Sequence, residues 1–212
     1  MPSAELPGAA QFIPKRASLS ELREAVQGCR GCPLYRNATQ AVFGEGPERA
    51  RIVLIGEQPG DQEDRQGRPF VGPAGKILDR ALVAAGIARR IAYVTNAVKH
   101  FSFEPRGKAR LHKRPRPGEI RACRSWLDAE LSALKPEGVV LLGATAAQSL
   151  LGPSFRVTRE RGRPLESDIA PLVIATIHPS SVLREPDSKA REHAFEGLVS
   201  DLRIVATHLQ GR

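Results

Sequence analysis

The chain has 212 residues, of which 41% are hydrophobic, so it is long enough to bury the core of one α/β domain. Its 32 Lys and Arg residues exceed its 23 Asp and Glu residues, and the net charge of +9 indicates an anionic partner, most often nucleic acid. No apolar run is long enough to span a membrane, and the first residues lack the apolar core of a signal peptide. Three cysteines are a poor number for a disulfide framework, so we expect a reducing cytoplasm.

The start of the chain differs in composition from the rest. Residues 1–17 are rich in Pro, Ala and Gly, and we expect a poorly ordered segment there. Residues 18–212 contain no linker and no internal repeat, which predicts a single domain. Near its beginning, Ser18 or Ser20 could cap a short helix that ends at about residue 27.

Short apolar runs, typical of buried strands, alternate with helical patterns along this domain. The strands are expected at 51–55, 91–95, 138–142 and 171–177. The helices between and after them are expected at 74–86, 117–134, 144–151 and about 188–208. This alternation predicts an α/β fold with three layers, α-β-α, around a central four-stranded parallel sheet.

Polar residues follow each predicted strand, at 56–58, 95–96, 143–145 and 178–181. Because the carboxyl ends of parallel strands share one edge of a sheet, we expect Glu57, Gln58, Asn96 and His178 to converge on one cleft. Their carboxylate, amide and imidazole groups suit a polar planar ring, on which Phe70 could stack. Each also has a plain structural reading: Phe70 could fill a small apolar cluster, Asn96 could cap a turn, and His178 could satisfy nearby backbone.

The cysteines suggest a metal centre. Cys29 and Cys32 form a Cys-x-x-Cys pair, Cys123 lies in a helical pattern, and His100 is the best candidate for a fourth ligand. The spacing alone does not separate zinc from an iron–sulfur cluster. The alternative is that Cys123 is simply a buried apolar residue and that the pair is free.

A basic segment follows the second strand. Residues 99–124 carry nine Lys or Arg residues and two acidic ones, and their Pro and Gly residues predict a loop that hangs over the cleft. Phosphate contact is a natural use of such a loop, although many charged runs are only solvated and mobile. His112 lies among these cations, which disfavour its charged form. A neutral imidazole can act as a nucleophile or a base, unless His112 is a bystander.

Several of these motifs together resemble the family 4 uracil-DNA glycosylases. They are Gly56-Glu57-x-Pro59-Gly60, Gly67-Arg68-Pro69-Phe70-Val71-Gly72, Thr95-Asn96 and His178-Pro179-Ser180. The resemblance runs from about Cys29 to the last helix. It implies the uracil-DNA glycosylase fold, a [4Fe-4S] cluster and the excision of uracil from damaged DNA during DNA repair.

Three departures from family 4 are informative. Family 4 has Ala at the position of Gln58 and a third Cys at the position of His100, and it lacks the basic loop that contains His112. All three features resemble the UdgX type, bacterial relatives that become covalently trapped on uracil-containing DNA through a loop histidine. In this chain the resemblance implies that His112, within Arg110-Leu111-His112-Lys113, is that residue, and that a cluster is held by Cys29, Cys32, His100 and Cys123.

The resemblance also implies roles for the cleft residues. Uracil would be bound by Gly56, Gln58, Phe70 and Asn96. His178 would stabilise the departing base, and Glu57 would stabilise the sugar cation. Gln58 would also order the loop for attack by His112.

DNA contacts are expected from Lys108, Arg110, Lys113, Arg114, Ser180 and Ser181. The implied partner is uracil-containing DNA, single-stranded by preference, with free uracil as the product. We expect a monomer in the bacterial cytoplasm, at the nucleoid. The alternatives are an ordinary turnover glycosylase of base-excision repair and a metal-containing nucleic-acid-binding module without catalysis.

Overall fold

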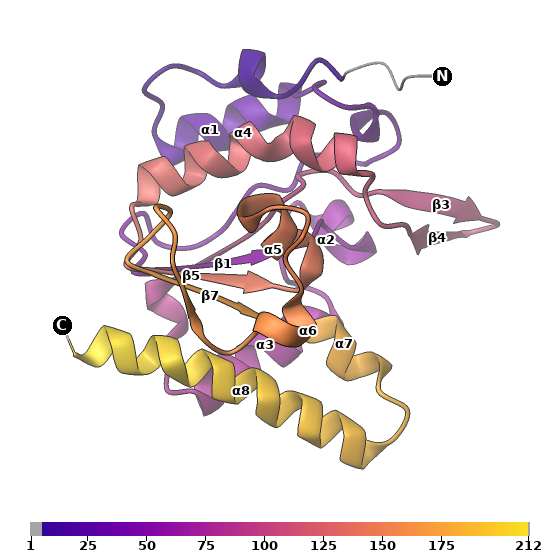
Figure 1. Cartoon of the computed structure of the whole chain (residues 1–212). Coiled ribbons are helices and arrows are strands. Elements are labelled where there is room, and N and C mark those ends of the chain that lie inside the picture. The colour runs from indigo at the N-terminus through magenta and orange to yellow at the C-terminus, as the bar shows by residue number, and fades with distance from the viewer. Residues whose placement is uncertain (1–5, 212) are drawn as a thin grey trace.

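A five-stranded sheet lies at the centre of the molecule (Figure 1). The computed structural model describes residues 6–211. The strand order of this sheet is β2-β1-β5-β7-β6, and the first four strands in that order run parallel. The bounds are β1 Ile52–Gly56, β2 Ala92–Asn96, β5 Gly138–Leu142, β7 Leu172–Thr176 and β6 Pro164–Leu165. The four predicted parallel strands are therefore confirmed. The two-residue antiparallel edge strand β6 was not predicted, because so short a segment carries no hydrophobic pattern.

Helices cover both faces of the sheet, as the alternating pattern predicted (Figure 1). On one face lie α1 Leu19–Ala25, α4 Pro117–Leu134 and α5 Ala144–Leu151; on the other lie α3 Pro73–Ala84, α7 Pro179–Arg184 and α8 Ser188–Gln210. Within β1, Val53 and Ile55 join the cluster that contains Trp126, whereas Ile52 and Leu54 pack towards α3 and α8. Because both faces are buried, each parallel strand is apolar throughout.

Short helices fill the connections. They are α2 Asp61–Gln66, α6 Val157–Glu160 and the 3-10 turns Ala10–Phe12, Val26–Gly28, Pro33–Arg36 and Arg89–Ile91. The predicted cap of α1 is present: the Ser18 hydroxyl accepts from the Glu21 N–H, and the Glu21 carboxylate accepts from the Ser18 N–H. No helix in the described range has the length and apolar character required to cross a membrane.

The N-terminal segment packs against the body where it is described. Residues 1–5 of the expected poorly ordered segment 1–17 lie outside the described range. The Gly8 N–H donates to the Gly31 carbonyl at 3.0 Å, and the Ala9 N–H donates to the Ala122 carbonyl at 2.7 Å. Ala9 is buried. These contacts attach the segment to the Cys-x-x-Cys turn and to α4.

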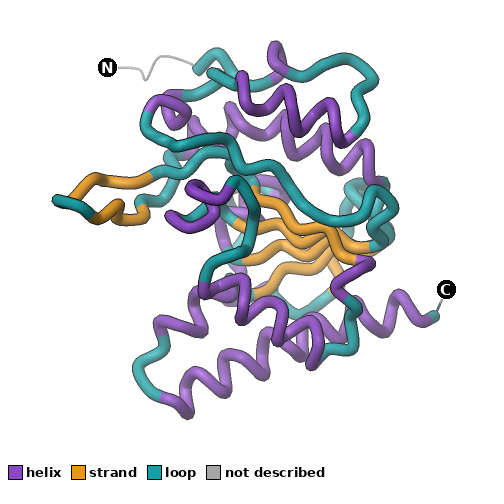
Figure 2. Tube along the Cα trace, turned by 180° about the vertical axis from the view of Figure 1, so that it is seen from behind, coloured by secondary structure: helices purple, strands orange, loops and turns teal. Residues whose placement is uncertain are grey.

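The basic segment after β2 is not the loop that its Pro and Gly residues predicted. It forms an antiparallel hairpin of β3 Phe103–Arg106 and β4 Ala109–His112, which stands apart from the main sheet (Figures 1 and 2). Gly107 has φ +58° at the first position of a two-residue turn, a conformation that glycine adopts without strain. Gly107 therefore marks the turn between two strands and does not indicate an irregular loop. The alternation typical of a strand was hidden because most of the hairpin's side chains are exposed and polar.

Candidate functional site

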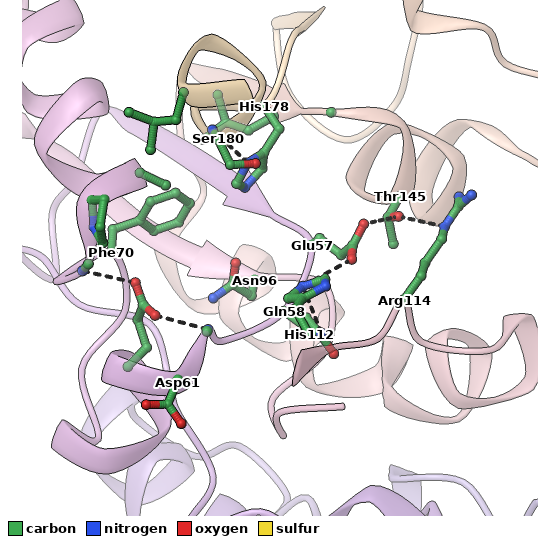
Figure 3. Close-up of a pocket in the computed structure, with 18 of the residues that line it drawn as sticks. Glu57, Gln58, Asp61, Phe70, Asn96, His112, Arg114, Thr145, His178 and Ser180 are labelled. Atoms are coloured by element: carbon green, nitrogen blue, oxygen red, sulfur yellow. Dashed lines mark hydrogen bonds and ion pairs between the residues drawn. The ribbon is translucent and has the colours of Figure 1, made fainter. Parts of the chain in front are cut away.

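A cavity of about 700 Å³ opens at the carboxyl edge of the parallel strands. Its walls include Glu57 and Gln58 after β1, Asn96 at the end of β2, and His178 after β7. The structure thus brings together the four residues that were expected at one cleft. Phe70, from the loop before α3, and His112, from the hairpin, also line the cavity (Figure 3).

Phe70 and Asn96 form one end of the cavity. The Phe70 ring lies 6.1 Å from that of His178, at an interplanar angle of 28°, and its backbone has φ +57°, a strained conformation for a side chain of this size. A Cβ on Gly56 would lie 2.4 Å from Asn96 Oδ1 and 2.7 Å from Phe70 Cζ, so only glycine keeps this floor open. The Asn96 side-chain amide has no hydrogen-bond partner among the described residues, which leaves its donors and acceptor for a ligand.

His178 is held as a neutral ring with a defined tautomer. Its Nδ1 accepts from the Ser180 N–H at 3.2 Å, so the neutral ring carries its proton on Nε2. Burial lowers the pKa of His178 to about 4, with smaller contributions from Arg184 and His112. Ser180 Oγ also lies 2.8 Å from Nδ1, and the Ser181 hydroxyl donates to the His178 carbonyl at 2.6 Å. The two serines that were expected to contact DNA therefore hold this turn.

The Gln58 side chain joins the strand end to the hairpin. Its Oε1 accepts from the Ser102 N–H at 2.9 Å, which fixes the orientation of the amide. Its Nε2 donates to the carbonyls of Ser102 and Lys113, at 3.1 and 3.0 Å, and lies 2.9 Å from His112 Nε2. An amide nitrogen can only donate, so His112 Nε2 must be the acceptor in this contact. The lone pair of that ring nitrogen consequently points at the Gln58 amide.

Glu57 lies beside the same imidazole. Its Oε1 is 3.5 Å from His112 Nε2, and its Oε2 accepts from the Thr145 hydroxyl (Figure 3). The Glu57 side chain is 23% exposed and that of His112 is 52% exposed. A carboxylate and an imidazole nitrogen thus share one mouth of the cavity.

The basic residues of the hairpin differ in orientation. Arg110 is turned inward: its side chain is 15% exposed, it donates to Asp61 at 2.5 Å and to Asp64 at 2.6 Å, and it lies over the rings of Phe101 and Phe103. It anchors the hairpin and has little surface left for phosphate.

The three other expected phosphate contacts remain more accessible. Lys113 pairs with Glu104, and Arg114 donates to Thr145 Oγ1 at 3.2 Å. Lys108 is exposed at the turn and has no side-chain partner among the described residues. Of the four, Lys108 is the cation that is freest to meet a phosphate.

The three cysteines are buried near one another. Burial raises the pKa of Cys32 to about 11 and that of Cys123 to about 12, and the neighbouring thiolates add to both shifts. The Trp126 indole N–H donates to Cys29 Sγ at 3.2 Å, and the Lys99 N–H donates to Cys123 Sγ at 3.3 Å. Such N–H donors around sulfur fit thiolate ligands.

The predicted metal centre is nevertheless not confirmed. Within residues 6–211, no group of three or more His, Cys, Asp or Glu side chains is arranged to hold a metal ion. His100 is buried, and burial lowers its pKa to about 4, so it is neutral, the form in which histidine binds metals. It directly follows Lys99, whose N–H reaches Cys123.

Two contributors to the site were not anticipated. Thr145, in the first turn of α5, donates to Glu57; its place after a predicted strand was the signal that could have identified it. Glu63 accepts from the Gly60 N–H at 2.9 Å and from the Gly72 N–H at 3.0 Å. It thereby ties the loop of Phe70 to the start of α2, a bridge that only the fold reveals.

The chain matches known proteins over most of its length. The model of the Uracil DNA glycosylase superfamily matches residues 43–203. A Type-4 uracil-DNA glycosylase of Thermotoga maritima is 38% identical over 185 residues, 86% of this chain and 93% of that protein. The corresponding protein of Archaeoglobus fulgidus is 36% identical over 80% of this chain and 85% of its own length. A Type-5 uracil-DNA glycosylase of Thermus thermophilus is 35% identical over 58% of each chain.

The matched region contains all five strands of the sheet, the cavity and the hairpin. The first two relatives are covered over more than two thirds of their own length. Sequence, fold and the residues at the strand ends therefore agree, and the chain belongs to the uracil-DNA glycosylase superfamily.

Proposed function

We propose that this protein recognises uracil in DNA, cleaves its N-glycosidic bond and becomes linked to the abasic site through His112. The observation that carries the proposal is the contact of 2.9 Å between Gln58 Nε2 and His112 Nε2. It holds His112 Nε2 as an acceptor, 3.5 Å from Glu57 Oε1, at the mouth of a cavity lined by the strand ends. Ordinary turnover by water at the same place is the alternative function.

Recognition of the base follows from the cavity walls. Uracil, flipped out of the stack, lies against the Phe70 ring, and the free amide of Asn96 bonds to its edge. Cytosine is rejected because its exocyclic amine reverses one donor and one acceptor, which leaves a buried polar group unpaired. The Nε2–H of His178 donates to the uracil oxygen on which negative charge develops.

The chemical step conserves atoms and charge. The bond between C1′ and N1 breaks, and its electron pair leaves with uracil, while Glu57 stabilises the positive charge on the sugar. The lone pair of His112 Nε2 forms the new bond to C1′. The imidazole then loses its Nδ1 proton, and the uracil anion gains one, so the products are free uracil and a neutral histidine adduct. A held nucleophile competes with water through its high effective concentration.

A denaturing gel tests the covalent product. The protein is incubated with a labelled uracil oligonucleotide, single-stranded or duplex, and heated in SDS. We expect a shifted band that is absent with a thymine control and absent from His112→Ala. Strand breakage by alkali without a shift would instead establish ordinary turnover. Neither product, with binding retained, would establish a nucleic-acid-binding module.

A matched histidine variant sharpens this test. His193 on α8 is exposed and does not line the cavity, so His193→Ala should crosslink like the unmodified protein. A heat-stable adduct that persists in His112→Ala would exclude His112 as the attacking residue. In that variant, water can occupy the vacated place, and uracil release with turnover is the expected activity.

We also propose that Cys29, Cys32, His100 and Cys123 hold an iron–sulfur cluster. The buried thiols, the two N–H donors to sulfur and the neutral His100 support this set. The cluster would link the N-terminal segment to α4 as a structural crosslink. Iron and acid-labile sulfide content tests the assignment: His100→Ala should lower both. Unchanged iron in that variant would exclude His100, and zinc in place of iron would overturn the cluster.

DNA contact is proposed for the exposed cations of the hairpin and of the residues that directly follow it. Lys108, Lys113 and Arg114 extend from the hairpin, whereas Ser180 and Ser181 are assigned to holding His178. Lys108→Gln should weaken binding of any sequence and reduce its salt dependence by about one unit of slope. An unchanged slope would remove Lys108 from the interface.

A further inference from the structure

Glu57 is the end of a directed chain of hydrogen bonds from α5. Arg114 Nε donates to Thr145 Oγ1 at 3.2 Å, and the Thr145 hydroxyl donates to Glu57 Oε2 (Figure 3). The Arg114 guanidinium is held in turn by Gln148 Oε1, at 3.1 Å. The Gln148 amide nitrogen donates to the Phe155 carbonyl at 3.1 Å, which fixes that side chain as well.

The direction of this chain follows from the donors. A guanidinium can only donate, so Thr145 Oγ1 must accept from Arg114. The hydroxyl proton of Thr145 is then available for Glu57 alone, and a carboxylate is the stronger acceptor. Thr145 is 2% exposed, so water does not replace either contact.

The two oxygens of Glu57 consequently have different surroundings. Oε2 is bound by Thr145, whereas Oε1 faces His112 Nε2 at 3.5 Å. A carboxylate on a flexible side chain could rotate and present either oxygen, at any angle. The bond from Thr145 selects one rotamer and points Oε1 into the cavity.

We propose that Thr145 is a positioning residue for the glycosidic cleavage, acting through Glu57. It holds the carboxylate so that Oε1 stabilises the positive charge of the sugar as the bond to uracil breaks. This inference rests on the proposed excision of uracil, but not on the crosslink. It applies equally whether His112 or water attacks, because both reactions pass through the same sugar cation.

Single-turnover release of uracil from labelled DNA tests the inference. Thr145→Val keeps the shape of the side chain and removes the hydroxyl. We expect about a 10- to 100-fold lower rate constant, as for the loss of one hydrogen bond to a charged group. Thr145→Ser restores the hydroxyl and should stay within about threefold of the unmodified protein. Thr207 is exposed on the outer side of α8, and Thr207→Val is the matched control for threonine replacement.

Two further readouts separate positioning from a structural role. The Kd for uracil-containing DNA and the unfolding temperature of Thr145→Val should match those of Thr207→Val. In a Glu57→Ala background, Thr145→Val should cause no additional loss of rate, because residues that act through one another are not additive. A full additional loss in that background would mean that Thr145 acts independently of Glu57.

The outcomes distinguish this inference from the function on which it depends. If the unmodified protein releases no uracil, the proposed excision fails. If it releases uracil and Thr145→Val does so at the same rate, only the role of Thr145 fails. A Thr145→Ser protein as slow as Thr145→Val would also overturn the role, because it would assign the effect to packing of the threonine methyl group.

Discussion

Gln58 and His112 face each other nitrogen to nitrogen, at 2.9 Å. Because the Gln58 amide is oriented by the Ser102 N–H, its nitrogen is the atom that faces His112 Nε2, and it can only donate in this contact. The two amide hydrogens of Gln58 serve three acceptors, since its Nε2 also reaches the carbonyls of Ser102 and Lys113. The contact to His112 is therefore readily released when the ring turns to another partner.

Replacement of Gln58 should uncouple capture from excision. Gln58→Met keeps the length of the side chain but removes its hydrogen bonds to the hairpin and to His112. We expect about a tenfold slower covalent capture and a smaller change in uracil release. Quenched-flow sampling on denaturing gels measures both. The exposed residue Gln66 provides the control Gln66→Met, and equal slowing of the two steps would contradict the role assigned to Gln58.

Arg110 should be an anchor whose loss loosens the hairpin. Arg110→Gln removes the partner of Asp64, which is fully buried, and we expect a loss of about 1–3 kcal/mol in the free energy of unfolding. Faster amide hydrogen exchange in β3 and β4 should accompany slower capture. Arg106→Gln, on the same hairpin but exposed, is the control. If Arg110→Gln reduced only the affinity for DNA, with unchanged exchange, the residue would instead be a phosphate contact.

The pH dependence of stability should reflect His178. Its pKa in the fold is about 4, below the value of about 6.5 in an unfolded chain, so the fold favours the neutral ring. As the pH falls from about 6.5 to 4, the unfolded chain takes up a proton that the folded protein does not. The free energy of unfolding should therefore decrease as the pH is lowered from about 6.5 to 4, and it should recover when the pH is raised above this window.

Denaturant unfolding at pH 7 and pH 5 measures this effect. His178→Gln should lose less stability than the unmodified protein between the two values, because one of its groups no longer titrates. His100 has the same sign of shift and remains in both proteins, so the difference isolates His178. An identical loss in both proteins would place the titration elsewhere. The rate of uracil release should likewise not fall through protonation of His178 until the pH approaches about 4, because the ring stays neutral above that value.

The ion pair of Lys99 and Glu130 should be a major contributor to stability. Both side chains are fully buried, and Lys99 also donates to Thr95 Oγ1 at 2.7 Å and to the Asn96 carbonyl at 2.9 Å. Lys99→Met should lower the free energy of unfolding by about 3–5 kcal/mol, because it leaves a buried carboxylate uncompensated. Thermal unfolding of Lys99→Met, Glu130→Gln and the double variant tests this. Additive losses in the double variant would show that the two charges are not coupled.

The sheet and the convergence of its polar ends could be predicted from the sequence. A strand buried on both faces must be apolar throughout, so runs such as 138–142 stand out from their surroundings. Once the strands are taken as parallel, their carboxyl ends share an edge. Residues as distant in the chain as Glu57 and His178 then meet without any knowledge of the loops.

The hairpin and its contacts could not be predicted in this way. Its strands pack on the body by one face only, and Pro105 interrupts the pattern. The inward orientation of Arg110 depends on the register of the hairpin and on Asp61 and Asp64, 49 and 46 positions away. The positive charge of the segment suggested that Arg110 contacts phosphate, whereas in the fold Arg110 pairs with the carboxylates of Asp61 and Asp64. Thr145 was hidden for a similar reason, because its partner Glu57 is 88 positions away.

The separation of the hairpin from the main sheet has a consequence for how the chain can vary. The two strands of the hairpin pair only with each other. Neither of them pairs with any of the five strands of the main sheet. The hairpin can therefore lengthen or shorten between β2 and α4 without changing how the five strands pair. A side chain of the hairpin, such as that of His112, can therefore change without altering the strand order of the main sheet.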